Sequence, residues 1–145
     1  MNMECQKKHI MELCRIERAI RGKKYKKGTL MIKLSAVDET VDQLERAGEI
    51  ESRYAALEPL DGVDPDYLYI TVCRSFPDFL RKHRTTINLK LEELKHLTLD
   101  WHKSDEAQRF MVEMMKVMDR ELEEEERLIS RAQEVKRWYL VKMMV

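Results

Sequence analysis

Two pairs of side chains have spacings that could bring metal ligands together. Glu93 and His96 have the Glu-x-x-His spacing that presents two ligands for iron or manganese on one face of a helix. Cys5 and His9, four residues apart, could supply half of a tetrahedral zinc site. The sequence has no second Glu-x-x-His motif, and no spacing signature brings further ligands to Cys5. We therefore expect no metal ion and no cofactor, and interpret the three cysteines as buried thiols.

The sequence also lacks the local patterns that position a catalytic nucleophile. It contains no Gly-x-Ser-x-Gly turn and no glycine-rich phosphate loop. Asp100 and His102 lie two residues apart, so on a helix they would point to different faces. We expect no catalytic residues and predict that the protein is not an enzyme. A metal-dependent helical-bundle enzyme is kept as a third alternative.

Charge is strongly sorted along the chain, although the formal net charge is zero. Residues 1–34 carry ten Lys or Arg against three Asp or Glu, whereas residues 35–72 carry two against ten. Five cations fall between residues 21 and 28, and such a self-repelling cluster is typical of contact with a polyanion or an acidic partner. Lysines would contact phosphates and an aromatic ring would stack on a base. The predicted contact residues are Arg21, Lys23, Lys24, Tyr25, Lys26 and Lys27.

Other interpretations of this cluster stay open. It has enough cations to contact an anionic membrane, but no apolar anchor adjoins it. Residues 16–26 resemble the IQ motif that binds calmodulin-type proteins, with Arg21, Gly22 and Lys26 in matching places and Glu17 where the motif has glutamine. That resemblance implies a calmodulin-type partner. A solvated, mobile basic loop without a partner would have the same sequence.

The composition favours long helices with few connections. Charged residues make up 37% of the chain, and only 4 Gly and 3 Pro are present. We predict an all-α fold, an antiparallel helical bundle of three to five helices that forms a single domain over residues 1–145. No segment reaches the roughly 20 apolar residues of a membrane span, and none has the pattern of a signal peptide. We therefore expect an intracellular, cytoplasmic protein.

Apolar periodicity predicts where the helices lie. Residues 1–28 should form a basic helix and loop, and residues 29–103 the middle helices, with a heptad seam at Leu30, Leu34, Val37, Val41 and Leu44. Residues 64–65, Asp-Pro, predict the start of a buried helix, which the proline at position 77 should end or kink.

The last part of the chain, residues 104–145, predicts one long helix. Ser104 is a typical N-cap, and neither Gly nor Pro follows it. A helix of nearly 40 residues would be about 57 Å long, which exceeds a compact monomer of this size with a radius of gyration of about 15 Å. We therefore expect a second subunit to cover the end of this helix. The predicted interface residues are Trp138, Tyr139, Val141, Met143 and Met144.

Together these patterns predict a non-enzymatic adaptor, a helical interaction and assembly module. It would self-associate, with a dimer favoured, and bind another macromolecule, most simply a protein. The alternative is a nucleic-acid-binding accessory protein that contacts RNA or DNA through residues 21–27.

Overall fold

The computed structural model describes residues 1–83 and 88–144. Contacts divide the chain into two compact units, Met1–Arg109 and Phe110–Val145. The first unit contains strands as well as helices, so the predicted all-α bundle is wrong. Its elements are β1 (Cys5–His9), a single 3₁₀ turn η1 (Ile10–Glu12), β2 (Cys14–Arg18), β3 (Leu30–Lys33), β4 (Val41–Gln43), β5 (Tyr54–Pro59), α1 (Pro65–His83), α2 (Leu91–Leu94) and β6 (Thr98–His102).

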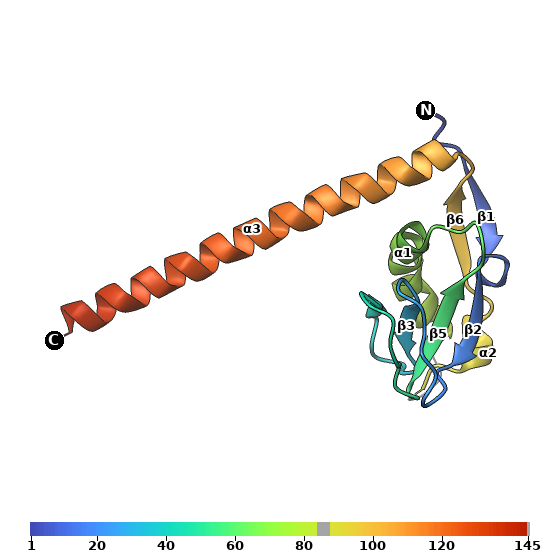
Figure 1. Cartoon of the computed structure of the whole chain (residues 1–145), viewed down its shortest axis with the longest axis horizontal. Coiled ribbons are helices and arrows are strands. Elements are labelled where there is room, and N and C mark those ends of the chain that lie inside the picture. The colour runs from blue at the N-terminus through green and yellow to red at the C-terminus, as the bar shows by residue number, and fades with distance from the viewer. Residues whose placement is uncertain (84–87, 145) are drawn as a thin grey trace. The chain divides into compact units, whose positions relative to one another are not determined.

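Two antiparallel sheets form the first unit (Figure 1). β1 pairs with β6, and the other four strands follow the order β2-β5-β3-β4. In the larger sheet the register places Arg18 opposite Ala55 and Ile32 opposite both Ala55 and Val41. β5 is therefore a central strand, and Ala55, Ala56 and Leu57 on it are fully buried.

Helix α1 joins the two sheets into one core. It packs against β6 of the small sheet and β4 of the large one. The Tyr67 ring meets Trp101 of β6 edge-to-face, with ring centroids 4.6 Å apart. The Tyr67 hydroxyl also accepts a hydrogen bond from the backbone N–H of His102 at 2.9 Å. The predicted helix start at residues 64–65 is confirmed, but α1 continues past Pro77 to His83.

The helix expected within residues 1–28 and the helix expected to carry the heptad seam of residues 30–44 do not form, because the apolar spacing of both segments fits short strands. In β2 the side chains of Cys14 and Ile16 are buried, whereas Arg15 is exposed and Glu17 is only partly buried, which is the period of two expected for a strand. The supposed heptad seam is not one surface. Val41 lies buried in β4, whereas Val37 is 81% exposed. Strands of three to six residues are too short for alternation to stand out in sequence.

The second unit consists of the greater part of one helix, α3 (Asp105–Met143). Its predicted cap is confirmed, because the Ser104 hydroxyl accepts a hydrogen bond from the backbone N–H of Ala107 at 3.4 Å. From Glu113 to Met144 every residue of the helix is exposed. Within the described residues, no helix is both long enough and apolar enough to cross a membrane.

Candidate nucleic-acid interface

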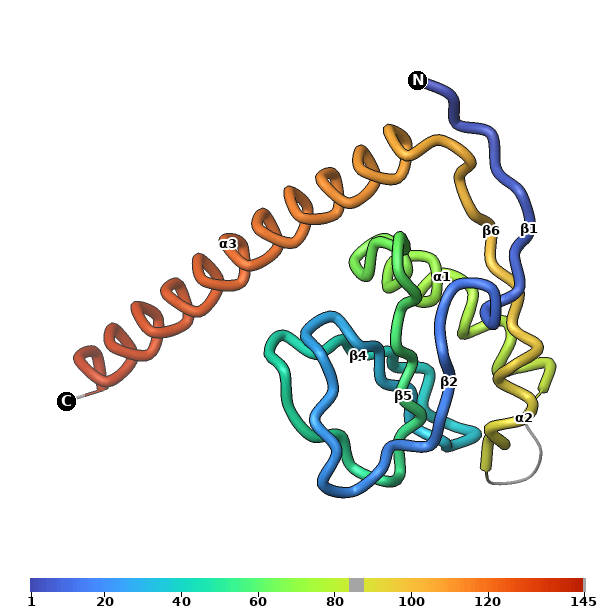
Figure 2. Tube along the Cα trace, turned by 45° about the vertical axis from the view of Figure 1, so that its right-hand side comes forward, coloured from blue at the N-terminus to red at the C-terminus, as the bar shows by residue number. Residues whose placement is uncertain are grey.

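The loop between β2 and β3 carries all six predicted contact residues. The loop turns at Gly22 and again at Gly28, both with positive φ angles of 85° and 93°. Figure 2 shows this loop beside the loop between β4 and β5. A two-way backbone pairing between Tyr25 and Gly48 holds the two loops together, with N–O distances of 2.7 and 3.0 Å. The basic loop is therefore held by hydrogen bonds to the loop between β4 and β5.

Tyr25 does not lie where a stacking residue must lie. Its side chain is 2% exposed and packs with Ala19, Ile50 and Ala56. Its hydroxyl donates a hydrogen bond to Glu17 at 2.9 Å and accepts one from the backbone N–H of Ile20 at 3.0 Å. Burial raises the pKa of this hydroxyl. The predicted stacking of Tyr25 on a base is therefore corrected: the ring is part of the core under the loop.

The Lys23 side chain forms ion pairs with two carboxylates. Its ammonium group donates hydrogen bonds to Glu17 and, at 3.1 Å, to Glu58 of β5. The hydrogen bond from Lys23 lowers the pKa of Glu17, and the hydrogen bonds to Glu17 and Glu58 raise the pKa of Lys23. Lys23 thus neutralises the carboxylate that holds Tyr25, and its ammonium group is not free to bind a phosphate.

The other four cations of the loop face solvent. Arg21, Lys24, Lys26 and Lys27 are exposed, and within the described part of the chain none of them forms an ion pair. Arg21 borders a shallow hollow that Glu49 and Glu51 also line. Acidic side chains of the neighbouring loop therefore weaken the positive field at Arg21, while the three lysines lie outside this hollow.

A second group of cations meets at the same end of the larger sheet. Arg18 ends β2, Arg53 precedes β5, and Lys90 precedes α2. Because β2 and β5 pair in antiparallel register, the end of one strand lies beside the start of the other. The three cations line one hollow of about 480 Å³ together with Leu34, Asn88, Leu89 and Leu91. Sequence reasoning missed this group because its members are far apart along the chain and only strand pairing unites them.

The spacing of Cys5 and His9 does not bring the two side chains together as metal ligands. Cys5 and His9 lie in β1, where four residues correspond to about 13 Å, too far for one metal ion to reach both. Among the described residues, no three His, Cys, Asp or Glu side chains gather as a metal site would require.

The cysteines differ in their surroundings. Cys14 is buried, and burial raises the pKa of its thiol to about 12. Cys73 is partly buried, and burial raises its pKa as well. Cys5 is exposed, so the prediction of three buried thiols is wrong for this residue.

Residues 16–26, which resemble an IQ motif, form the end of β2 and part of the loop after it, not a helix. In the structure these residues belong to an edge strand of the larger sheet and to the hydrogen-bonded loop that follows it.

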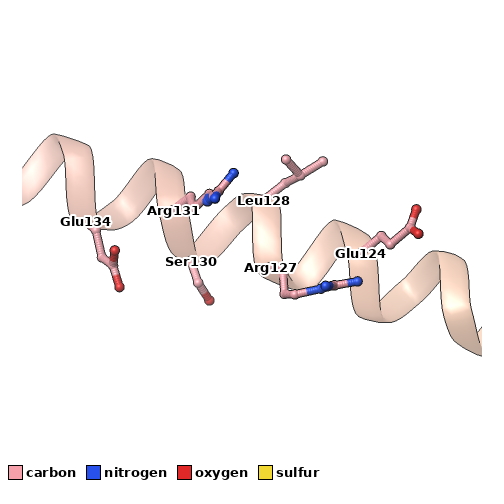
Figure 3. A pocket seen from close by; sticks show the side chains of 6 residues that line it. All are labelled: Glu124, Arg127, Leu128, Ser130, Arg131 and Glu134. Carbon is pink, nitrogen blue, oxygen red and sulfur yellow. The ribbon is translucent and has the colours of Figure 1, made fainter.

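The predicted interface residues all lie exposed near the end of α3. Trp138 and Tyr139 are each 56% exposed, and Met143 and Met144 are 77% and 84% exposed. Val141 is 61% exposed. Side chains in the middle of the helix outline a shallow hollow at Glu124, Arg127, Leu128, Ser130, Arg131 and Glu134. Figure 3 shows them spreading outward in different directions from one helix, so they enclose no cavity.

The similarity between this chain and known proteins is a similarity of fold. No family model matches the sequence, and no curated protein resembles it in sequence. The S subunit of the type I restriction-modification system from M. genitalium matches 85% of this chain with a TM-score of 0.70 and 17% identity. A structure of complex assembly and conformational transition in a type I restriction-modification system matches 94% with a TM-score of 0.74 and 16% identity. The HsdS subunit from Thermoanaerobacter tengcongensis matches 83% with a TM-score of 0.56 and 14% identity.

These matches cover only part of each known structure. The chain spans 41%, 44% and 38% of the three matched chains, so more than half of each has no counterpart in the alignment. The sequence identities are too low to transfer individual residues. The chain therefore has a fold similar to part of these structures, which include S subunits of restriction-modification systems.

Proposed function

We propose that residues 1–109 form a DNA-recognition module. The observation that carries this proposal is the fold, which matches S subunits over 83–94% of the chain. These structures belong to restriction-modification systems, and restriction and modification are reactions on DNA. The proposal favours the nucleic-acid-binding alternative over a protein adaptor.

The distribution of cations supports DNA as the ligand. Lys24, Lys26 and Lys27 project from a loop that backbone hydrogen bonds hold to the loop between β4 and β5. Phosphate contacts by such side chains supply affinity that is independent of sequence and orient a protein on a duplex. The loop is pre-organised, so little conformational entropy is lost when its lysines bind phosphates.

We further propose that α3 pairs with a second copy of this chain. Its apolar side chains at Met118, Leu122 and Ile129 fall on one face and are all exposed. Between residues 105 and 126 the helix carries nine acidic and three basic side chains, whereas between residues 127 and 143 it carries one acidic and five basic ones. An antiparallel pair of these helices would set each acidic half against a basic half, which favours that orientation over the parallel one.

A direct binding experiment tests the DNA proposal. We would titrate a fluorescent 20-base-pair duplex with the full chain and with the variant Lys24→Ala/Lys26→Ala/Lys27→Ala, and follow anisotropy. The control variant, Lys8→Ala/Lys82→Ala/Lys103→Ala, removes the same charge elsewhere in the unit. We expect the loop variant to lose at least tenfold in affinity and the control variant to lose much less. Equal affinity of the native chain and the loop variant would contradict a role for these lysines.

A further inference from the structure

The hollow lined by Arg18, Arg53 and Lys90 is a cationic site with no carboxylate in its lining among the described residues. Its three cations come from β2, from the residue before β5 and from the residue before α2. Arg18 and Lys90 are exposed, and no described residue forms an ion pair with either of them. Like charges brought together repel each other, and such a cluster is typical of a surface that binds an anion.

Arg53 has one carboxylate partner, but that pair is weak. Its guanidinium lies 2.8 Å from Glu51, and the two side chains are 58% and 68% exposed. An exposed pair of this kind contributes little and exchanges readily with solvent. The Arg53 guanidinium also lies 5.5 Å from the centre of the Tyr54 ring, and its ion pair with Glu51 is made through Nε. Glu51 does not line the hollow.

The backbone around the hollow is fixed by the sheet. The N–H of Ala19, next to Arg18, donates to the carbonyl of Tyr54 at 3.0 Å, and the N–H of Leu34 donates to the carbonyl of Arg53 at 3.1 Å. Leu89 is 2% exposed and anchors the segment that carries Lys90. The cations therefore sit on a rigid base, which is the arrangement that binds a ligand with little loss of entropy.

The side chains that line the hollow are suited to bind a phosphate ester. Two guanidinium groups and one ammonium group offer only donors, and planar guanidinium groups bind phosphate oxygens in pairs. Leu34 and Leu91 add apolar surface beside these donors, which suits the sugar that accompanies a backbone phosphate. The basic loop begins directly after Arg18, so both groups of cations lie along the same end of the larger sheet.

We propose that this hollow binds backbone phosphates of DNA as a second contact beside the basic loop. The proposal rests on the proposed function of residues 1–109. The loop lysines and the hollow would then contact separate phosphates and together fix the orientation of the module on the duplex, a task that backbone contacts commonly perform.

The test measures duplex binding between 50 and 200 mM salt for the native chain, for Arg18→Ala/Lys90→Ala and for the control Arg74→Ala/Lys82→Ala. The control removes one exposed arginine and one exposed lysine of α1, with the same loss of charge. We expect the hollow variant to raise the Kd about tenfold at 100 mM salt. We expect it to reduce the slope of log affinity against log salt by about 1.8, or 0.9 per phosphate contact. Arg18→Lys/Lys90→Arg, which keeps both charges, should retain most of the binding.

The outcomes separate this inference from the function on which it rests. Native binding that the hollow variant leaves unchanged, or that the control variant weakens equally, contradicts the inference alone. Absence of binding by the native chain contradicts the proposed function and the inference with it. A parallel titration with inorganic phosphate distinguishes the source of the ligand: if the hollow variant loses phosphate binding but not duplex binding, the site serves a small free anion and the inference is overturned. Circular dichroism of each variant confirms that the fold is intact.

Discussion

The hydroxyl of Tyr25 donates a hydrogen bond to Glu17 at 2.9 Å, so an aromatic ring of the basic loop is joined to a carboxylate of β2. The same carboxylate accepts a hydrogen bond from Lys23. The aromatic residue that the sequence offers for base stacking thus supports the loop from below. Its exposed neighbours remain available to a ligand, and the conformation of the loop depends on the buried contact.

This contact predicts a structural role for Tyr25. Tyr25→Phe removes the hydrogen bond to Glu17 and leaves the N–H of Ile20 without its partner. We expect the free energy of unfolding, measured in urea, to fall by about 1–3 kcal/mol. Tyr54→Phe, which alters a half-buried tyrosine of β5, is the control and should change stability much less. Unchanged stability of Tyr25→Phe would contradict this structural role of the hydroxyl.

The ion pair of Lys23 with Glu17 predicts how stability depends on pH. The folded-state pKa of Glu17 lies below its usual 4.5, so its contribution is present above pH 4.5 and is lost as the pH falls through the folded value. The folded-state pKa of Lys23 lies above its usual 10.5, so its contribution is complete below pH 10.5 and is lost as the pH rises further. We expect Lys23→Met to flatten the acid limb of a plot of unfolding free energy against pH. An acid limb identical to that of the native chain would show that this pair does not contribute.

At Gly28 the basic loop packs so closely against the start of α1 that a side chain has no room. Its φ angle is +93°, and an added Cβ would lie 2.9 Å from the Cβ of Pro65. We expect Gly28→Ala to cost about 2–4 kcal/mol of unfolding free energy, from backbone strain and from the clash. Gly22→Ala, with a φ angle of +85° and no atom within 4 Å of the added Cβ, isolates the strain and should cost about 1–2 kcal/mol. Equal costs at the two positions would mean that the loop moves away from Pro65 freely.

The prediction of α3 from sequence succeeded because its signals are local. A serine cap, a first turn with two carboxylates and the absence of Gly and Pro specify a helix without reference to the rest of the chain. The start of α1 at an Asp-Pro pair is a signal of the same kind.

The sheets could not be predicted in the same way. β3 and β4 have four and three residues, and what stabilises them is pairing with partners elsewhere in the chain. The low content of glycine and proline was misleading, because loops such as residues 34–40 and 44–53 are built mainly from polar and charged residues. The hollow at Arg18 depends on that pairing as well. It has no sequence signal other than three isolated cations.

The exposed apolar face of α3 predicts a dimer in solution. Sedimentation equilibrium should give a mass of about 35 kDa, twice the 17.4 kDa of one chain. Leu122→Gln/Ile129→Gln places polar groups on the apolar face and should shift the protein to the monomer. Arg120→Gln/Arg131→Gln, on the opposite side of the helix, should leave the dimer largely intact. A native chain that stays monomeric at high micromolar concentration would contradict the proposed pairing.

DNA binding by residues 1–109 is the central claim, and its dependence on salt is the most direct test. Affinity of the full chain for a duplex should fall linearly on a plot of log affinity against log salt. A slope of about −6 corresponds to the four exposed loop cations together with the three of the hollow, at 0.9 per contact. No detectable binding at 50 mM salt, or an affinity that salt does not change, would contradict the account.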